Sequence, residues 1–236
     1  MSEPITISAK NLGALAMPGF CPRCFWIQMH AGGIPYQIFP GIFSSIDAYN
    51  KRLVHGCFDC RQSAPPWLSL LGNIKGYSIP PHYSKFSILD PNTNIVLRGT
   101  PDGILVMHDN SYVVVDYKTA KFAPDQDELF PMYDVQLNAY AVIGEQTGLS
   151  PVSALALIYA EPITDDVAAR KDSNQTASGF FMEFSTHIRS VDLAPQKIPP
   201  LLAKVREIYE LSRAPLPPEG CVNCSLLQGL INLAAL

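Results

Sequence analysis

Two C-x-x-C pairs lie near opposite ends of the 236-residue chain, and together they restrict how it can fold. The first pair is Cys21 and Cys24, and the second is Cys221 and Cys224. Four thiolates are enough to hold one Zn²⁺ ion or one [4Fe–4S] cluster, and a shared site would hold the two ends of the chain together. The spacing therefore predicts a single domain of residues 1–236 in which residues 1–30 and 215–236 form a metal-binding subdomain.

A third pair, Cys57 and Cys60, can take the place of one outer pair, but two unligated cysteines are the simpler interpretation. The first residues lack a basic stretch followed by an apolar core, and no apolar run is long enough to cross a bilayer. We therefore expect a cytoplasmic protein with no membrane partner. In that compartment, paired cysteines indicate metal or redox chemistry rather than structural disulfides.

Composition predicts a packed core, because 47% of the residues are hydrophobic and only 16% are charged. The formal net charge is −4. A protein that grips a long duplex non-specifically is usually basic, so extensive contact with phosphates requires a local cluster of basic residues or a partner that supplies charge. The candidates for phosphate contacts are Arg23, Lys51, Arg52, Lys118 and Lys121, and Trp26 and Trp67 are candidates for stacking on bases.

The centre of the chain has the clearest secondary-structure pattern. Strands are predicted at 94–97, 103–107 and 112–117, and the turn residues Asp109 and Asn110 indicate a hairpin between the last two. Periodicity elsewhere predicts helices at 6–15, 45–54 (capped by Ser44 or Ser45), 133–143 and 201–211, strands at 152–159 and 179–184, and a loop at 72–81. This order is typical of an α/β core with a mixed sheet and flanking helices.

Acidic residues flank the predicted hairpin. Asp102 lies in a turn before one strand, and Asp116 and Lys118 lie two apart on the other strand, so they share a face. Two carboxylates can hold Mg²⁺ or Mn²⁺, and the backbone carbonyl of Tyr117 can add a ligand. A lysine beside such an ion can orient or deprotonate an attacking water and stabilise charge on a phosphate. A D-x-K pair alone would more often be a solvated strand end with a surface ion pair.

Gln136 and Tyr140 lie four apart on the next predicted helix and therefore share one helix face. These side chains can bond a phosphate or a base near the metal, although alone they would more often be a half-buried tyrosine and a polar neighbour. With Asp102 and the Asp116-Tyr117-Lys118 triplet they complete a longer string: an aspartate in a turn, a hairpin, D-x-K and Q-x-x-x-Y.

This string resembles the motifs of the PD-(D/E)XK nuclease superfamily, and within it the RecB-like branch and the CRISPR-associated adaptation nucleases. The resemblance implies a restriction-endonuclease-like fold, metal binding by Asp102 and Asp116, a catalytic Lys118, and DNA contacts by Gln136 and Tyr140. It covers separate motifs, from Ile7-Ser8-Ala9 and Cys21-Pro22-Arg23 to the last cysteine pair, and it does not extend to residues 56–91 or 165–196.

The resemblance also bears on the metals. Related RecB-like nucleases hold an iron–sulfur cluster with one N-terminal and three C-terminal cysteines, whereas this chain has two and two, so [4Fe–4S] and Zn²⁺ both fit. The branch usually has one further ligand, a histidine or an acid, on a helix before the first strand. His55 resembles the histidine type and is our first choice, and Asp47 is the harder oxygen ligand. Either can instead be a surface residue.

The predicted function is hydrolysis of DNA phosphodiesters that depends on Mg²⁺ or Mn²⁺, at single-stranded or free ends. Repair, recombination or CRISPR adaptation is the expected role, with a helicase or an adaptation complex as protein partner. Two alternatives stay open: a non-catalytic DNA-binding module of the same fold, and a structural zinc or redox protein whose D-x-K is incidental. The presence of Asp102, Asp116 and Lys118 together favours the enzyme.

Overall fold

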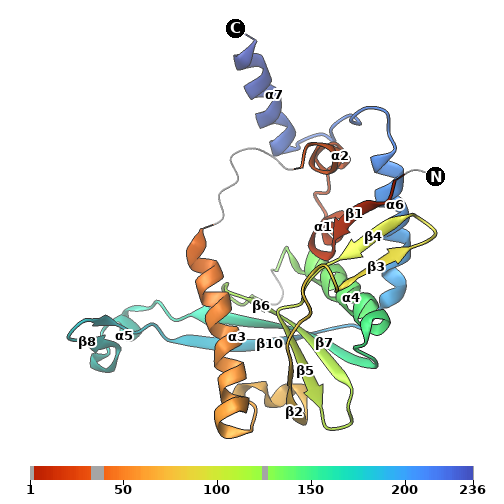
Figure 1. Cartoon of the computed structure of the whole chain (residues 1–236). Coiled ribbons are helices and arrows are strands. Elements are labelled where there is room, and N and C mark those ends of the chain that lie inside the picture. The colour runs from red at the N-terminus through yellow and green to blue at the C-terminus, as the bar shows by residue number, and fades with distance from the viewer. Residues whose placement is uncertain (1–2, 33–39, 124–126, 236) are drawn as a thin grey trace.

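The computed structural model describes residues 3–32, 40–123 and 127–235. Within these residues the largest element is a mixed sheet of five strands (Figure 1). Its order is β10 (Phe184–Val191), β7 (Val152–Pro162), β6 (Tyr112–Lys118), β5 (Gly103–Met107) and β2 (Ile74–Ser78). β6 and β7 run parallel, and the other neighbours are antiparallel. A parallel pair needs a crossover connection, which contains α4 (Phe130–Thr147).

A second sheet in the described part of the chain has three strands. β4 (Ile95–Arg98) lies between β1 (Ile5–Ser8), which runs parallel to it, and the antiparallel β3 (Ser87–Asp90). Helix α4 lies between this sheet and the large one (Figure 1), and one apolar core joins them. Leu97 of β4, Leu137 of α4 and Leu157 of β7 are fully buried in that core.

The opposite face of the large sheet is covered by α3 (Gly41–Arg61) and by the 3-10 helix η2 (Pro66–Leu71). Val54 and Phe58 of α3 are buried there together with Leu68 of η2. The large sheet is therefore a middle layer, with α4 on one side and α3 on the other (Figure 1).

The alternation of side chains along β6 assigns its residues to these two layers. Val113, Val115 and Tyr117 belong to the core beneath α3, whereas Val114 belongs to the core around α4. Side chains alternate along a strand, so Asp116 lies on the same face as Val114. One strand thus contributes to both cores and also directs an acidic side chain toward α4.

The remaining elements lie mainly at the two ends of the chain. α6 packs on the core through Ile198, Leu202, Val205 and Ile208, and the small elements between β7 and β10 form a projection from the sheet (Figure 1). The bounds are α1 (Ala9–Gly13), η1 (Ala14–Ala16), α2 (Pro22–Ala31), α5 (Asp166–Ala169), η3 (Asp172–Asn174), β8 (Gln175–Thr176), β9 (Gly179–Phe180), η4 (Pro195–Lys197), α6 (Ile198–Tyr209) and α7 (Val222–Ala234).

The predicted mixed sheet with flanking helices is confirmed, as is the central hairpin. β5 and β6 pair with Gly103 opposite Val115, and Asn110 in the turn has a φ of 65°. Asparagine tolerates this left-handed conformation better than most residues, which explains why the turn could be identified from the sequence. In the described part of the chain, no helix has the length and apolar character that a membrane span requires.

Several local predictions were wrong. The loop predicted at 72–81 contains the edge strand β2, whose exposed Lys75 and irregular register conceal its alternation. The helix predicted at 6–15 begins only at Ala9, because the preceding residues pair with β4 as β1. Helix α3 begins at Gly41, so neither Ser44 nor Ser45 caps it. The strand predicted at 179–184 divides into β9 and the start of β10.

Gly99 provides a test of the packing between the two sheets. A Cβ atom at this position would lie 2.3 Å from Cε1 of Tyr140, whereas one at Gly19 would meet nothing within 4 Å. We expect Gly99→Ala to lower the free energy of unfolding by about 1–3 kcal/mol, because the buried tyrosine must shift. Gly19→Ala is the matched control and should leave the denaturation midpoint unchanged. Equal midpoints for both variants would contradict the packing described for Gly99.

Candidate active site

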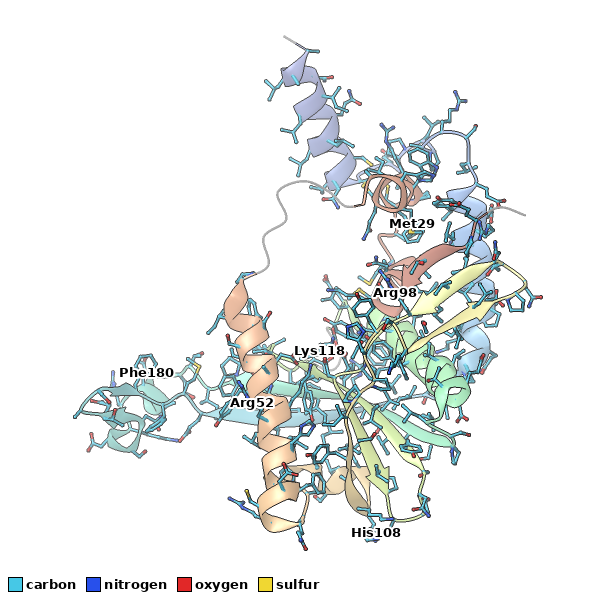
Figure 2. All side chains as sticks on the ribbon, viewed as in Figure 1. Met29, Arg52, Arg98, His108, Lys118 and Phe180 are labelled. Carbon is cyan, nitrogen blue, oxygen red and sulfur yellow. The ribbon has the colours of Figure 1, made fainter. Side chains whose placement is uncertain are left out.

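Four of the charged residues singled out in the sequence meet in a cleft between α3, α4 and the ends of β5 and β6, namely Asp47, Asp102, Asp116 and Lys118. The cleft has a volume of about 590 Å³. Its lining residues are Lys10, Phe43, Ser44, Asp47, Asp102, Asp116, Tyr117, Lys118, Thr119, Ala120, Leu129, Met132, Tyr133, Gln136 and Tyr140. Lys118 marks its position at the end of β6 (Figure 2).

Asp116 is the most deeply buried acidic residue of the cleft, with 3% of its surface exposed. Burial, and after it the negative charge of Asp102, raise the pKa of this carboxyl to about 7, although Lys118 acts in the opposite direction. One carboxylate oxygen forms an ion pair with the Lys118 ammonium. That ammonium also lies 4.1 Å from the centre of the Tyr133 ring, which stabilises a cation and fixes its place.

Asp102 approaches the same point from the loop before β5. Its Oδ2 atom accepts a hydrogen bond from the backbone N–H of Tyr117 at 3.0 Å, which links the loop to β6. Its Oδ1 atom accepts a hydrogen bond from Lys51 Nζ at 2.7 Å. Tyr117 lies between the two aspartates at the cleft, and the role of its carbonyl as a metal ligand stays a prediction.

Helix α3 contributes an acid and a base to the same group. Lys51 Nζ lies 2.8 Å from Asp47 Oδ2 as well as 2.7 Å from Asp102, so one ammonium bridges two carboxylates. Burial lowers the pKa of Lys51, but the attraction of Asp102 and Asp47 outweighs it and the net shift is upward. From the sequence, Lys51 was predicted only as a phosphate contact. Its spacing of four residues from Asp47 was a signal for this ion pair.

His55, the other candidate ligand on α3, does not line the cleft. Its ring stacks on Tyr77 of β2 at 3.9 Å with an interplanar angle of 8°. Burial lowers the pKa of the imidazole. The structure therefore brings Asp47, and not our first choice His55, to the two aspartates.

Gln136 and Tyr140 lie on the side of α4 that faces Asp116, and both are buried. Gln136 Nε2 donates a hydrogen bond to Asp116 Oδ1 at 3.2 Å and another to the Tyr140 hydroxyl at 2.9 Å. The Oε1 atom of Gln136 is buried and has no hydrogen-bond partner among the described residues. The Gln136 amide therefore orients the buried Asp116 carboxylate, and its Oε1 atom can still accept a hydrogen bond.

Other basic and aromatic candidates lie outside the cleft lining. Arg52, labelled on α3 in Figure 2, and Lys121 are exposed. Trp26 donates a hydrogen bond to the Leu211 carbonyl at 3.0 Å, which joins α2 to the segment after α6. Trp67 and Tyr117 line a separate pocket between α3 and the large sheet.

The four outer cysteines form a second group, away from this cleft. Their sulfur atoms all lie within 4.8 Å of one another, and Cys24 lies 3.4 Å from Cys224 and 3.7 Å from Cys221. Cys21 precedes α2 and Cys221 precedes α7, so the group joins the two ends of the chain as the sequence predicted. Among the described residues, Cys57 and Cys60 belong to no metal-ligating group, and both lie on α3.

The thiols differ in how readily they ionise. A backbone N–H of Cys224 directed at Cys221 lowers the pKa of the Cys221 thiol to about 7. Burial raises the pKa of Cys224 to about 11 and that of Cys24 further still. Four clustered thiolates without a cation would repel one another, so the donor set fits a metal ion that favours sulfur.

Comparison with known proteins identifies the family. The model of the PD-(D/E)XK nuclease superfamily matches residues 68–227, and the chain therefore belongs to this superfamily. One similar solved structure is described as "Crystal structure of SSO0001"; it shares 15% identity and a TM-score of 0.46, over 90% of this chain and 80% of that one. No curated protein matches the chain in sequence.

The cysteine group can be tested by metal analysis of purified protein. We expect about one metal centre per chain, and Cys24→Ala or Cys224→Ala should remove it and lower the melting temperature by several degrees, because metal binding and folding are coupled. Cys60→Ala is the control, since Cys60 is exposed and lies outside the group. Folded, metal-free parent protein with the same melting temperature as Cys24→Ala would contradict the expectation.

Proposed function

We propose that this protein hydrolyses DNA phosphodiester bonds in a reaction that depends on Mg²⁺ or Mn²⁺, with Asp102, Asp116 and Lys118 as its active-site residues. The observation that carries the proposal is their convergence at one cleft in a chain of the PD-(D/E)XK nuclease superfamily. The same observation disfavours a structural zinc or redox protein, because such a protein does not need two carboxylates and a lysine in a cleft.

The donor set of the cleft fits a hard divalent cation. Asp47, Asp102 and Asp116 offer carboxylate oxygens and Tyr117 offers a carbonyl, and Mg²⁺ and Mn²⁺ prefer such ligands. One oxygen of Asp47 is buried and has no hydrogen-bond partner among the described residues, so it fits the role of a metal ligand. When bound, the ion supplies positive charge at the scissile phosphate and lowers the pKa of a bound water.

The protein's own groups would orient the reactants. Lys118, held between the Asp116 carboxylate and the Tyr133 ring, can donate a hydrogen bond to the attacking water or to a phosphate oxygen. Gln136 holds Asp116 in place and can offer Oε1 to a water. Lys51 balances the charge of Asp47 and Asp102, and a cation at these carboxylates would free its ammonium for the substrate.

The finer parts of the proposal rest on the motifs. We assign the chain to the RecB-like branch, with a role in repair, recombination or CRISPR adaptation, in the cytoplasm and together with a helicase or an adaptation complex. Single-stranded or free DNA ends are the proposed substrate, with Gln136 and Tyr140 near the DNA. The chain forms one nuclease domain in which residues 1–30 and 215–236 make the metal-binding subdomain.

For the cysteine group we propose a single tetrahedral ion such as Zn²⁺ in preference to [4Fe–4S]. Sulfur atoms at about 2.3 Å from a tetrahedral zinc lie about 3.8 Å apart. The distances of 3.4–3.7 Å between three of the sulfur pairs are close to this value. A cluster places iron and sulfide between the thiolates and needs them further apart. Zinc, iron and sulfide analysis of protein purified without oxygen distinguishes the two.

The catalytic assignment predicts that Asp116→Ala and Lys118→Ala each reduce the cleavage rate by at least about 100-fold, because each removes a group that contacts the metal or the reacting phosphate. The measurement is cleavage of end-labelled single-stranded and duplex DNA with and without Mn²⁺. Asp166→Ala and Lys75→Ala remove exposed charges outside the cleft and should cut at the parental rate. Well-folded Asp116→Ala protein that cuts as fast as the parent would refute the assignment.

The third acidic ligand is tested by a Mn²⁺ titration of cleavage. We expect Asp47→Ala to raise the Mn²⁺ concentration for half-maximal rate by about tenfold or more, as losses at metal sites usually do. His55→Ala should leave this concentration unchanged, because His55 stacks on Tyr77 outside the cleft. A shift in His55→Ala combined with none in Asp47→Ala would reverse the assignment.

A further inference from the structure

A second hollow adjoins the cleft on the side of the small sheet. It has a volume of about 380 Å³, which falls within the range of about 300–1,000 Å³ of typical ligand clefts. Lys10 and Tyr140 line both the hollow and the cleft, so a strand that leaves the cleft past these residues enters the hollow. The lining residues are Ser8, Ala9, Lys10, Tyr83, Arg98, Gly99, Thr100 and Tyr140.

The hollow is locally basic in a chain whose net charge is −4. Lys10 and Arg98 are both exposed, and no acidic residue is among the lining residues. Neither cation forms an ion pair with any residue that the structure describes, in contrast to Lys118 of the cleft and to Lys51, which pairs with the cleft aspartates Asp47 and Asp102. Two uncompensated cations beside a cleft provide the local cluster that contact with phosphates requires.

An aromatic side chain completes the hollow. Half of the surface of Tyr83 is exposed, and the guanidinium of Arg98 lies 5.4 Å from the centre of its ring. Arg98, labelled in Figure 2, is the last residue of β4. It precedes Gly99, whose lack of a side chain lets the Tyr140 ring pack against the backbone. The hollow is therefore lined by the exposed ring of Tyr83, by the cations Lys10 and Arg98, and by the backbone at Gly99 with the buried Tyr140.

We propose that this hollow binds a nucleotide of single-stranded DNA next to the scissile phosphate. Lys10 and Arg98 contact phosphate oxygens, and Tyr83 stacks on the base. Stacking on an aromatic ring requires a base that is free of its duplex neighbours, so the site selects a single strand over a blunt duplex. The inference deepens the proposed function and rests on it, because the strand must also occupy the cleft.

The two kinds of contact can be separated by measuring binding in EDTA, where no cleavage occurs. The probe is a fluorescent oligothymidylate, and its dissociation constant is measured by anisotropy over a series of salt concentrations. Each lost phosphate contact should reduce the slope of log affinity against log salt by about 0.7. We expect this reduction for Lys10→Ala and for Arg98→Ala. Lys75→Ala and Arg213→Ala, which remove exposed cations outside both hollows, should keep the parental slope.

Stacking has a different signature. Tyr83→Ala should weaken binding by about fivefold or more at every salt concentration without changing the slope, and Tyr83→Phe should restore binding because it keeps the ring. A blunt duplex of the same length should bind more weakly than the single strand and respond less to Tyr83→Ala.

The outcomes distinguish this inference from the proposed function. Parental slopes in Lys10→Ala and Arg98→Ala, parental affinity in Tyr83→Ala, or equal responses of single strand and duplex would overturn the nucleotide site, even if the parent cuts DNA with Mn²⁺. Conversely, a parent that binds through these three residues but leaves DNA intact with Mn²⁺ overturns the catalytic proposal and supports the site. Absence of any binding to the single strand overturns the site.

Discussion

The buried carboxylate of Asp116 determines most of what surrounds it. An ionised carboxylate inside a protein is unfavourable unless it is paired and hydrogen-bonded, and Asp116 is 3% exposed on the strand β6. The fold meets this need from two directions: Lys118 from the same strand, and Gln136 from α4. The remaining shift of its pKa toward 7 shows that these partners do not fully compensate for burial beside Asp102. Such an incompletely compensated acid in a cleft is typical of functional sites.

The two-residue alternation of β6 makes this arrangement possible. Val115 and Tyr117 pack beneath α3, while Asp116 faces α4, so one short strand holds both layers together and supplies the acid. Asp102 is fixed to the same strand by the Tyr117 N–H, and Lys51 draws Asp102 toward Asp47 on α3. The loop before β5, the end of β6 and helix α3 are far apart in the sequence, and polar contacts join them at the end of the central strand of the sheet. Carboxylates held in this way are already close together before a cation arrives.

The sequence was sufficient where the spacing of residues within a motif carries the information. The hairpin, the shared face of Asp116 and Lys118 and the pairing of the outer cysteines all follow from spacing, and the structure confirms their placement. The sequence was insufficient where contacts with distant segments determine the secondary structure or the position of a side chain. β1 and β2 pair with strands distant in the chain; β1 is only four residues long, and the exposed Lys75 and irregular register of β2 conceal its alternation. Asp47 rather than His55 lies at the cleft because of how α3 crosses the sheet. Helical periodicity places both residues on roughly one face of the helix, so it could not show which of them reaches the cleft.

The cysteine group and the cleft are joined through the N-terminal segment. Cys21 and Cys24 fix α2 to α7. The 3-10 helix η1 and a short turn connect α2 to α1, which carries Lys10 between the cleft and the basic hollow. α1 itself packs tightly on α4, since a Cβ at Gly13 would lie 2.4 Å from the Met132 carbonyl oxygen. The short β1 and the 5-residue α1 have few internal hydrogen bonds and depend on these attachments at either end. A metal bound by the four thiolates would therefore also restrict the segment that places Lys10 beside the cleft.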